Sequence, residues 1–497
     1  MAIKAIKNSL QPATDKSGVI QNYIGGSWVS ASSTKELPVT NPATSEILAR
    51  VPLSNHTDVG KAVEAAEKAF PAWRETPVLE RARILFRLKA LLEEKADDLA
   101  VSLTQEHGKT RSESRGEIQR GIENVEHACG MPALLMGDTL EDIAPGVDCE
   151  TIRQPIGVFA AITPYNFPIM IPLWFWPYAI ATGNTFVLKP SEQDPLTHQQ
   201  IVVLIEEAGL PHGVLNVVHG NQETVTALLE HPDLNGVSFV GSSRVAKIIY
   251  AKAAAEGKRV QALGGAKNHM IVLPDADYDQ VAQVVNASIF GCAGQRCLAG
   301  SVVVGVEDAF EPVREKVVQM ASALRIGNGL EENVDMGPVI SAPHRDRVRT
   351  YINQGVDDGA TLLLDGREAR VAAYPKGNWV GPTVFTDVKP EMGIGREEIF
   401  GPVATFTHAK SLDDAVELMH RNPYGNATSI FTTSGRTARE FRYRAGISMI
   451  GVNIGVAAPM AFFPFGGSRG SFYGDLKAQG RDAIEFYTDK RVVISRW

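Results

Sequence analysis

The stretch that decides the fold is "TFVLKPSEQDPLTHQQIVVLIEEAGLPHGVLNVVHG", residues 185–220. Two short apolar runs, "TFVLKP" and "VLNVVHG", stand on either side of a longer mixed segment, "THQQIVVLIEEAG". This pattern predicts a strand, a helix and a second strand. Because parallel neighbouring strands need a crossover of a dozen or more residues, usually a helix, the stretch predicts a βαβ unit.

The same alternation continues on both sides of this unit. Apolar runs such as "VFAAIT" and "GVSFVGS" alternate with helical segments between residues 157 and 263. A second alternation, with runs such as "HMIVLP" and "SVVVGV", extends from residue 267 to about 448. Strands separated by helices in this way predict parallel sheets covered on both faces. We therefore expect two α/β domains.

Two segments lie outside this alternation: "DCETIRQPIG" around residue 150 and the final "AIEFYTDKRVVISRW". Both have the pattern of strands with charged positions. Such strands would be exposed edges in a monomer, so they predict a sheet completed by another subunit and a homo-oligomer, either a dimer or a tetramer. Elsewhere, helical spacing over residues 79–103 predicts one amphipathic helix.

Composition narrows the class of partner. The 497 residues carry a net charge of −8, with 49 Lys and Arg against 57 Asp and Glu and no basic stripe, which argues against nucleic acid. The longest apolar run, residues 167–181, contains three prolines and is too short for a membrane span. The first residues contain no apolar signal core, so we expect a cytoplasmic protein. Four cysteines without zinc spacing predict neither a metal site nor a disulfide framework.

One glycine-rich stretch, "FGCAGQRCLAGS" at residues 290–301, contains two thiols. Cys297 directly follows Arg296, where we expect a loop to enter a helix. A guanidinium and a helix N-terminus would both lower the pKa of a thiol and make it nucleophilic. A reactive thiol and a buried structural cysteine both fit this pattern. Cys292, close to Phe290, is expected to be a core residue.

Polar side chains follow several of the predicted strands, at the sheet edge where ligands gather. Asn166 in "ITPYNFP" could donate to an oxyanion, or it could bond its own turn. Glu192 in "LKPSE" could bind a ribose and select NAD over NADP, or it could lie in a solvated loop. Ser242 in "FVGS" could meet a phosphate or only cap a helix. No Gly-x-Gly-x-x-Gly motif follows any of these strands.

Taken in order, "TPYNFP", "KPSE", "FVGS", "GQRC", "EEIFGP" and the tail "FPFGGSRGSFYGD" resemble the aldehyde dehydrogenase superfamily along essentially the whole chain. The resemblance implies an NAD-binding domain (residues 18–135 and 156–265), a catalytic domain (266–460) and a small β oligomerisation arm (136–155 and 476–497). It makes Cys297 the nucleophile, and it makes Asn166 with the backbone N–H of Cys297 the oxyanion hole. The NAD-binding residues that it implies are Thr163, Tyr165, Lys189, Glu192, Gln193, Ser242, Gly264 and Glu398.

Two departures from the hydrolytic members point to the CoA-acylating branch of this superfamily. Leu263, in "LGGAK", stands where hydrolytic members have the glutamate that activates water, and leucine cannot act as a base. Arg120 and Arg296 match positions that, in the acylating branch, hold a substrate carboxylate. From the residues alone, Arg120 equally fits a solvated helix face. Ala246 replaces a usual glycine and leaves the exact placement of the cofactor open.

The resemblance implies NAD-dependent oxidation of a carboxylated semialdehyde, with NAD as cofactor and coenzyme A as co-substrate. Methylmalonate or malonate semialdehyde would give propionyl-CoA or acetyl-CoA through a thioester on Cys297, with loss of carbon dioxide or bicarbonate. Two alternatives remain at this point. One is a hydrolytic aldehyde dehydrogenase that releases a free acid, and the other is a catalytically silent NAD-binding structural protein.

Overall fold

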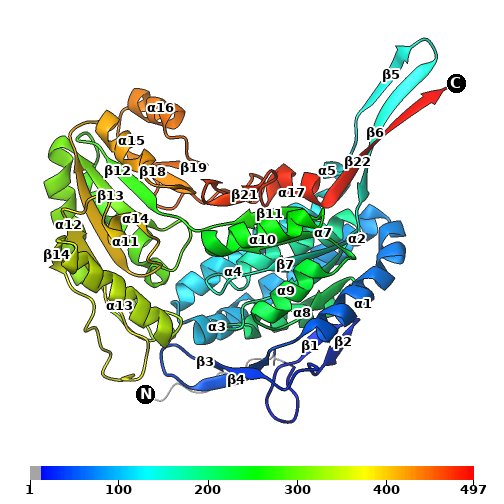
Figure 1. Cartoon of the computed structure of the whole chain (residues 1–497), viewed down its shortest axis with the longest axis horizontal. Coiled ribbons are helices and arrows are strands. Elements are labelled where there is room, and N and C mark those ends of the chain that lie inside the picture. The colour runs from blue at the N-terminus through cyan, green and yellow to red at the C-terminus, as the bar shows by residue number, and fades with distance from the viewer. Residues whose placement is uncertain (1–9, 11–12) are drawn as a thin grey trace.

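The computed structural model describes residue 10 and residues 13–497, and these form two sheet-centred bodies from which a long β arm projects (Figure 1). The body nearer the N-terminus has an eight-stranded sheet in the order β2-β1-β9-β8-β7-β10-β11-β21. Its parallel strands are β7 (Val158–Ile162), β8 (Thr185–Lys189), β9 (Leu215–Val217), β10 (Leu234–Val240) and β11 (Arg259–Leu263). Antiparallel strands β1 (Asn22–Ile24), β2 (Ser27–Val29) and β21 (Phe472–Gly474) complete it.

The predicted βαβ unit is confirmed. Strands β8 and β9 pair in parallel, with Phe186 opposite Leu215, and α8 (Leu196–Glu207) connects them. Because the sheet is covered on both faces, all five residues of β7 and of β8 are buried, which explains their continuous apolar character. Further helices of this body include α1 (His56–Glu75), α7 (Trp176–Thr182), α9 (Gln222–Glu230) and α10 (Ser243–Ala255).

The second body is built on a seven-stranded sheet in the order β14-β15-β16-β13-β12-β18-β19. All of its pairs are parallel except β14 with β15. The strands are β12 (Asn268–Val272), β13 (Gly300–Val306), β14 (Thr361–Leu364), β15 (Thr383–Thr386), β16 (Val403–Ala409), β18 (Ala427–Phe431) and β19 (Met449–Val452). The helices are α11 (Tyr278–Phe290), α12 (Phe310–Ser322), α13 (Ala342–Asp357), α15 (Leu412–His420) and α16 (Gly435–Arg444). The α/β class with two mainly parallel sheets is confirmed, whereas the exact domain boundaries remain a prediction.

The single helix expected over residues 79–103 is wrong. The structure has two helices, α2 (Val78–Glu94) and α3 (Ala96–His107), with a break at Lys95. The physical reason is burial: the change of direction lets Leu99 and Leu103 of α3 join the same core cluster as Leu88 and Leu92 of α2. Helical spacing in the sequence shows the apolar face of each helix but not the turn between the two helices.

The C-terminal segment is only partly the strand that we expected. Residues Gly480–Tyr487 form α17, and the strand β22 covers Thr488–Arg496. The helix forms because its apolar residues, among them Ile484 and Tyr487, are buried at helical spacing. Strand β22 pairs with β6 (Val147–Pro155), which pairs with β5 (Thr139–Ala144), and these three strands are the arm in Figure 1.

Among the described residues, no helix is long and apolar enough to cross a membrane.

Candidate active site

The two thiols lie on a loop that joins α11 to β13. Residues Gly291–Gly294 form a kinked turn in which Cys292, Ala293 and Gly294 all have left-handed backbones, with φ of 50°, 52° and 73°. Cys297 lies in the next turn, just before β13 begins at Gly300. The expected helix entry at Cys297 is therefore wrong, because the helix precedes this loop and a strand follows it.

The surroundings of the two thiols differ. Cys292 is buried, and its Sγ accepts a hydrogen bond from Nε of Arg296 at 3.2 Å. Cys297 is half-buried, and both cysteines line a cavity of about 320 Å³. The guanidinium that we expected beside Cys297 thus contacts the other thiol. Burial, together with the nearby carboxyl of Glu398, raises the pKa of Cys297 to about 12.

The raised pKa gives the first prediction. Because only the thiolate is nucleophilic, alkylation of Cys297 by iodoacetamide in the protein without cofactor should rise about tenfold per pH unit from pH 7 to 9 without reaching a plateau. Peptide mass spectrometry at residues 290–301 measures it, with a Cys297→Ser variant to confirm the labelled site. A rate that is already constant between pH 6 and 7.5 would show that the thiol has a low pKa instead.

Asn166 lies next to this loop and is held at both ends. Its side-chain Nδ2 donates to the backbone carbonyl oxygen of Gln295 at 3.1 Å, and the backbone carbonyl oxygen of Asn166 accepts from Nζ of Lys109 at 2.8 Å. An amide NH₂ has two N–H groups, so one remains for a ligand. The structure therefore brings Asn166 to the loop of Cys297, as an oxyanion donor requires.

Two asparagines that we did not single out hold Cys297 itself. The carbonyl of Cys297 accepts from Nδ2 of Asn268 at 2.9 Å and from Nδ2 of Asn426 at 3.0 Å. Asn268 begins β12 and Asn426 directly precedes β18, so both approach from the second sheet. The sequence signal that could have identified these two asparagines is their position in "GGAKN" and "NPYGN", where apolar strands begin.

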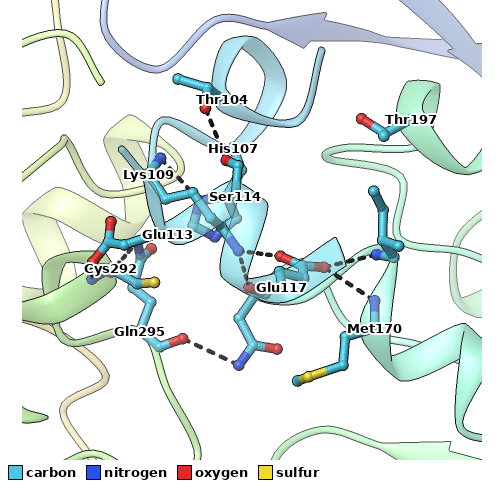
Figure 2. Close-up of polar contacts among 12 residues, drawn as sticks. Thr104, His107, Lys109, Glu113, Ser114, Glu117, Met170, Thr197, Cys292 and Gln295 are labelled. Carbon is cyan, nitrogen blue, oxygen red and sulfur yellow. Dashed lines mark hydrogen bonds and ion pairs between the residues drawn. The ribbon is translucent and has the colours of Figure 1, made fainter. Parts of the chain in front are cut away.

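A buried ion pair supports the Asn166 segment (Figure 2). Nζ of Lys109 lies 2.5 Å from Oε2 of Glu117, and both side chains are fully buried. Oε1 of Glu117 accepts the backbone N–H groups of Ile169, at 2.8 Å, and of Met170, at 3.1 Å. Glu117 belongs to α4 (Arg111–Cys129), so the pair ties this helix to the turn that follows Asn166. Sequence reasoning missed both residues because no pattern marks a charge as buried.

Most of the predicted cofactor residues lie at the carboxyl edge of the first sheet. Thr163 and Tyr165 follow β7, Lys189 ends β8, and Glu192 accepts from Nζ of Lys189 at 2.7 Å. Gln193 comes next in this loop. This is the edge at which parallel sheets bind nucleotides. The hydroxyl of Thr163 is buried and has no hydrogen-bond partner among the described residues, which leaves it available to a ligand.

The remaining cofactor residues stand around the same edge. Ser242 caps α10, with its Oγ accepting from N of Val245 at 3.4 Å, so the free N–H groups of that helix end point at this edge. Gly264 follows β11, and a Cβ there would lie 2.7 Å from Oγ of Ser243, so only glycine fits. Ala246, on α10, is buried in the core. The structure thus brings these residues to one edge, and their roles towards the adenosine and phosphates remain a prediction.

Glu398 reaches this edge from the second body. Its Oε1 accepts the backbone N–H of Ala266 at 3.0 Å, and it lines a small cavity together with Cys297. Burial raises the pKa of Glu398 to about 7. Its role at the nicotinamide ribose remains a prediction.

Both predicted substrate arginines line the cavity of Cys297. Nη1 of Arg120, on α4, lies 2.9 Å from Oε2 of Glu123, and Nη2 of Arg296 lies 3.1 Å from Oε1 of Glu113. Leu263, at the end of β11, is buried in the core cluster against which Cys297 packs. No group of three or more His, Cys, Asp or Glu side chains suited to a metal occurs in the described part of the chain.

An α/β protein in which a cysteine faces a cavity beside a dinucleotide-binding sheet edge has the arrangement of the cysteine-dependent dehydrogenases. The model of the aldehyde dehydrogenase family matches residues 28–493, and the chain belongs to that family, which confirms the resemblance seen in its motifs.

Its relatives include malonate-semialdehyde dehydrogenases. The chain is 51% identical to malonate-semialdehyde dehydrogenase 1 of Geobacillus kaustophilus over 479 residues, which cover 96% of this chain and 98% of that protein. The solved structure of methylmalonate-semialdehyde dehydrogenase from Oceanimonas doudoroffii matches with a TM-score of 0.95 and 46% identity, covering 96% of this chain and 98% of that one. A putative methylmalonate-semialdehyde dehydrogenase from Sinorhizobium meliloti, solved with NAD, matches with a TM-score of 0.95 and 43% identity over the same shares.

Proposed function

We propose that this protein is an NAD-dependent dehydrogenase that oxidises malonate or methylmalonate semialdehyde and transfers the acyl group to coenzyme A. The observation that carries the proposal is one cavity lined by Cys297, Arg120 and Arg296. A thiol and two guanidinium groups suit a substrate with an aldehyde at one end and a carboxylate at the other. The names of the relatives described above support the same substrate class.

In the proposed reaction, Cys297 gives up its proton to solvent, and the thiolate adds to the aldehyde carbon. The oxygen becomes negative and accepts from the unused N–H of Asn166 and from the backbone N–H of Cys297. The arginines orient the far carboxylate so that the aldehyde carbon meets the sulfur. Bound NAD would take the hydride that leaves this carbon. A thioester on Cys297 remains.

The fate of the thioester depends on Leu263. A buried leucine cannot deprotonate water, so hydrolysis has no general base at this position. The thiol of coenzyme A attacks the thioester carbon instead, the sulfur of Cys297 leaves, and the proton of the coenzyme A thiol ends on Cys297. For malonate-type substrates, the bond between the α-carbon and the carboxylate breaks, carbon dioxide departs, and a proton takes its place; the released carbon dioxide becomes bicarbonate when water adds to it. The products are acetyl-CoA or propionyl-CoA.

Dependence on coenzyme A tests this function. With NAD and methylmalonate semialdehyde but no coenzyme A, we expect a burst of about one NADH per active site and then little turnover. Adding coenzyme A should start continuous NADH formation. Equal steady-state rates with and without coenzyme A would instead show a hydrolytic aldehyde dehydrogenase.

Restoring a base should change the acceptor. We expect Leu263→Glu to raise the steady-state rate without coenzyme A by at least about tenfold, because general-base catalysis typically contributes about 10²–10⁴-fold and the new carboxyl is buried. Leu263→Gln, of the same size but without a base, is the control and should leave that rate unchanged. No increase in Leu263→Glu over Leu263→Gln would contradict the role given to this position.

The arm supports an oligomer. Leu140, Ile143, Val492 and Ile494 are exposed apolar residues on β5 and β22, where a second subunit could cover them. We infer a dimer or a tetramer, which sedimentation would distinguish. The cytoplasmic location remains a prediction that rests on the sequence.

A further inference from the structure

Glu113 connects α4 to the loop of the two thiols. Its Oε1 accepts the backbone N–H of Cys292 at 2.6 Å and lies 3.1 Å from Nη2 of Arg296. Its Oε2 accepts the backbone N–H of Thr110 at 2.9 Å, which closes the capping box at the start of α4. In Figure 2, Glu113 and Cys292 lie side by side. One carboxylate thus holds a helix end, a loop and a substrate arginine.

The loop that Glu113 holds is strained. Cys292 and Ala293 are left-handed residues with side chains, a conformation that costs roughly 1–2 kcal/mol for each such residue. Gly294 continues the turn where a Cβ would lie 2.1 Å from the carbonyl oxygen of Gly401. Such strain persists only where the surroundings hold it. The hydrogen bond from Cys292 to Glu113 is one of the contacts that do so.

The contacts of Arg296 fix its orientation. Nε donates to Sγ of Cys292 at 3.2 Å, Nη1 donates to the carbonyl of Ala287 at 3.3 Å, and Nη2 donates to Glu113. A guanidinium has five N–H groups, so two remain for an anion. Arg296 therefore presents a fixed pair of donors to the cavity, but its charge is already shared with a carboxylate.

We propose that Glu113 is a specificity-determining positioning residue: it fixes the turn before the nucleophile and weakens the hold of Arg296 on the substrate carboxylate. The inference rests on the proposed function, in which that carboxylate is bound and then lost as carbon dioxide or bicarbonate. Without a negative charge beside it, Arg296 would bind the substrate carboxylate strongly, although this carboxylate has to leave. A neighbouring negative charge reduces this attraction.

Two variants separate the two roles. Glu113→Gln keeps an oxygen for the N–H of Cys292 but removes the charge and the acceptor for Thr110, whereas Glu113→Ala removes all three. Glu126→Gln, on the exposed side of the same helix, is the matched control for loss of one negative charge. The readout is the NADH burst without coenzyme A, measured against substrate concentration for methylmalonate semialdehyde and for propanal. The burst does not depend on which acceptor resolves the thioester.

For Glu113→Gln, we expect the apparent Kd of methylmalonate semialdehyde to fall about fivefold relative to the wild type, with that of propanal unchanged. Glu113→Ala should slow the burst about tenfold with both aldehydes, because the turn loses its acceptor. Glu126→Gln should behave as the wild type does.

Suppose that the wild type prefers the carboxylated aldehyde. If Glu113→Gln then changes the apparent Kd equally for both aldehydes, or for neither, the inference is overturned. A wild type with no such preference would overturn the proposed carboxylate clamp and, with it, this inference.

Discussion

Replacing Cys297 with serine should reduce the NADH burst by at least about 10³-fold. A hydroxyl is a far weaker nucleophile than a thiolate, because it loses its proton far less readily than a thiol does. The burst, followed at 340 nm with excess NAD and semialdehyde, measures acylation alone.

The other cysteines supply the controls. Cys149→Ser, on the arm strand β6, should leave the burst unchanged. Cys292→Ser keeps an acceptor for Nε of Arg296 and should retain at least about a tenth of the burst rate. If Cys292→Ser lost the burst and Cys297→Ser kept it, the nucleophile would be Cys292, and the role given to Cys297 would be wrong.

Breaking the buried ion pair should have the largest effect on stability. Lys109→Met leaves the carboxylate of Glu117 buried without its cation, which costs about 3–5 kcal/mol of unfolding free energy. The same change removes the donor to the carbonyl of Asn166 and should also slow the burst. Urea unfolding of the holoenzyme measures the first effect and NADH formation the second.

A double variant isolates the charge. Lys109→Met with Glu117→Gln leaves no charge in the pocket, while the amide oxygen can still accept from Ile169 and Met170, so part of the lost stability should return. Lys68→Met, which removes an exposed partner of Glu64, should leave unfolding unchanged. A double variant no more stable than Lys109→Met would show that the buried charge is not the cause.

The alternation of apolar runs with helical segments predicted the fold, because strands buried on both sheet faces are apolar at every position. The strands β7 and β8 are continuous apolar runs for this reason. It could not show the break at Lys95 or the helix before β22, since these depend on which core cluster each stripe joins. Local pattern specifies an element, whereas its direction depends on tertiary packing.

The site was predicted to the same extent. The residues alone left Cys297 and Asn166 open between a functional and a structural role, and the family resemblance assigned their roles; the structure brings Asn166 to the loop of Cys297. Adjacency in sequence was misleading for Arg296, because the backbone turn directs its guanidinium to Cys292 and Glu113. Lys109 and Glu117 carry no sequence signal of burial, although their pair holds the segment that positions Asn166.

The most direct test of the account is product analysis by mass spectrometry after incubation with methylmalonate semialdehyde, NAD and coenzyme A. The account predicts propionyl-CoA in equal amount to NADH, together with one equivalent of carbon dioxide or bicarbonate. Free carboxylic acid in equal amount to NADH, with coenzyme A unchanged, would contradict it.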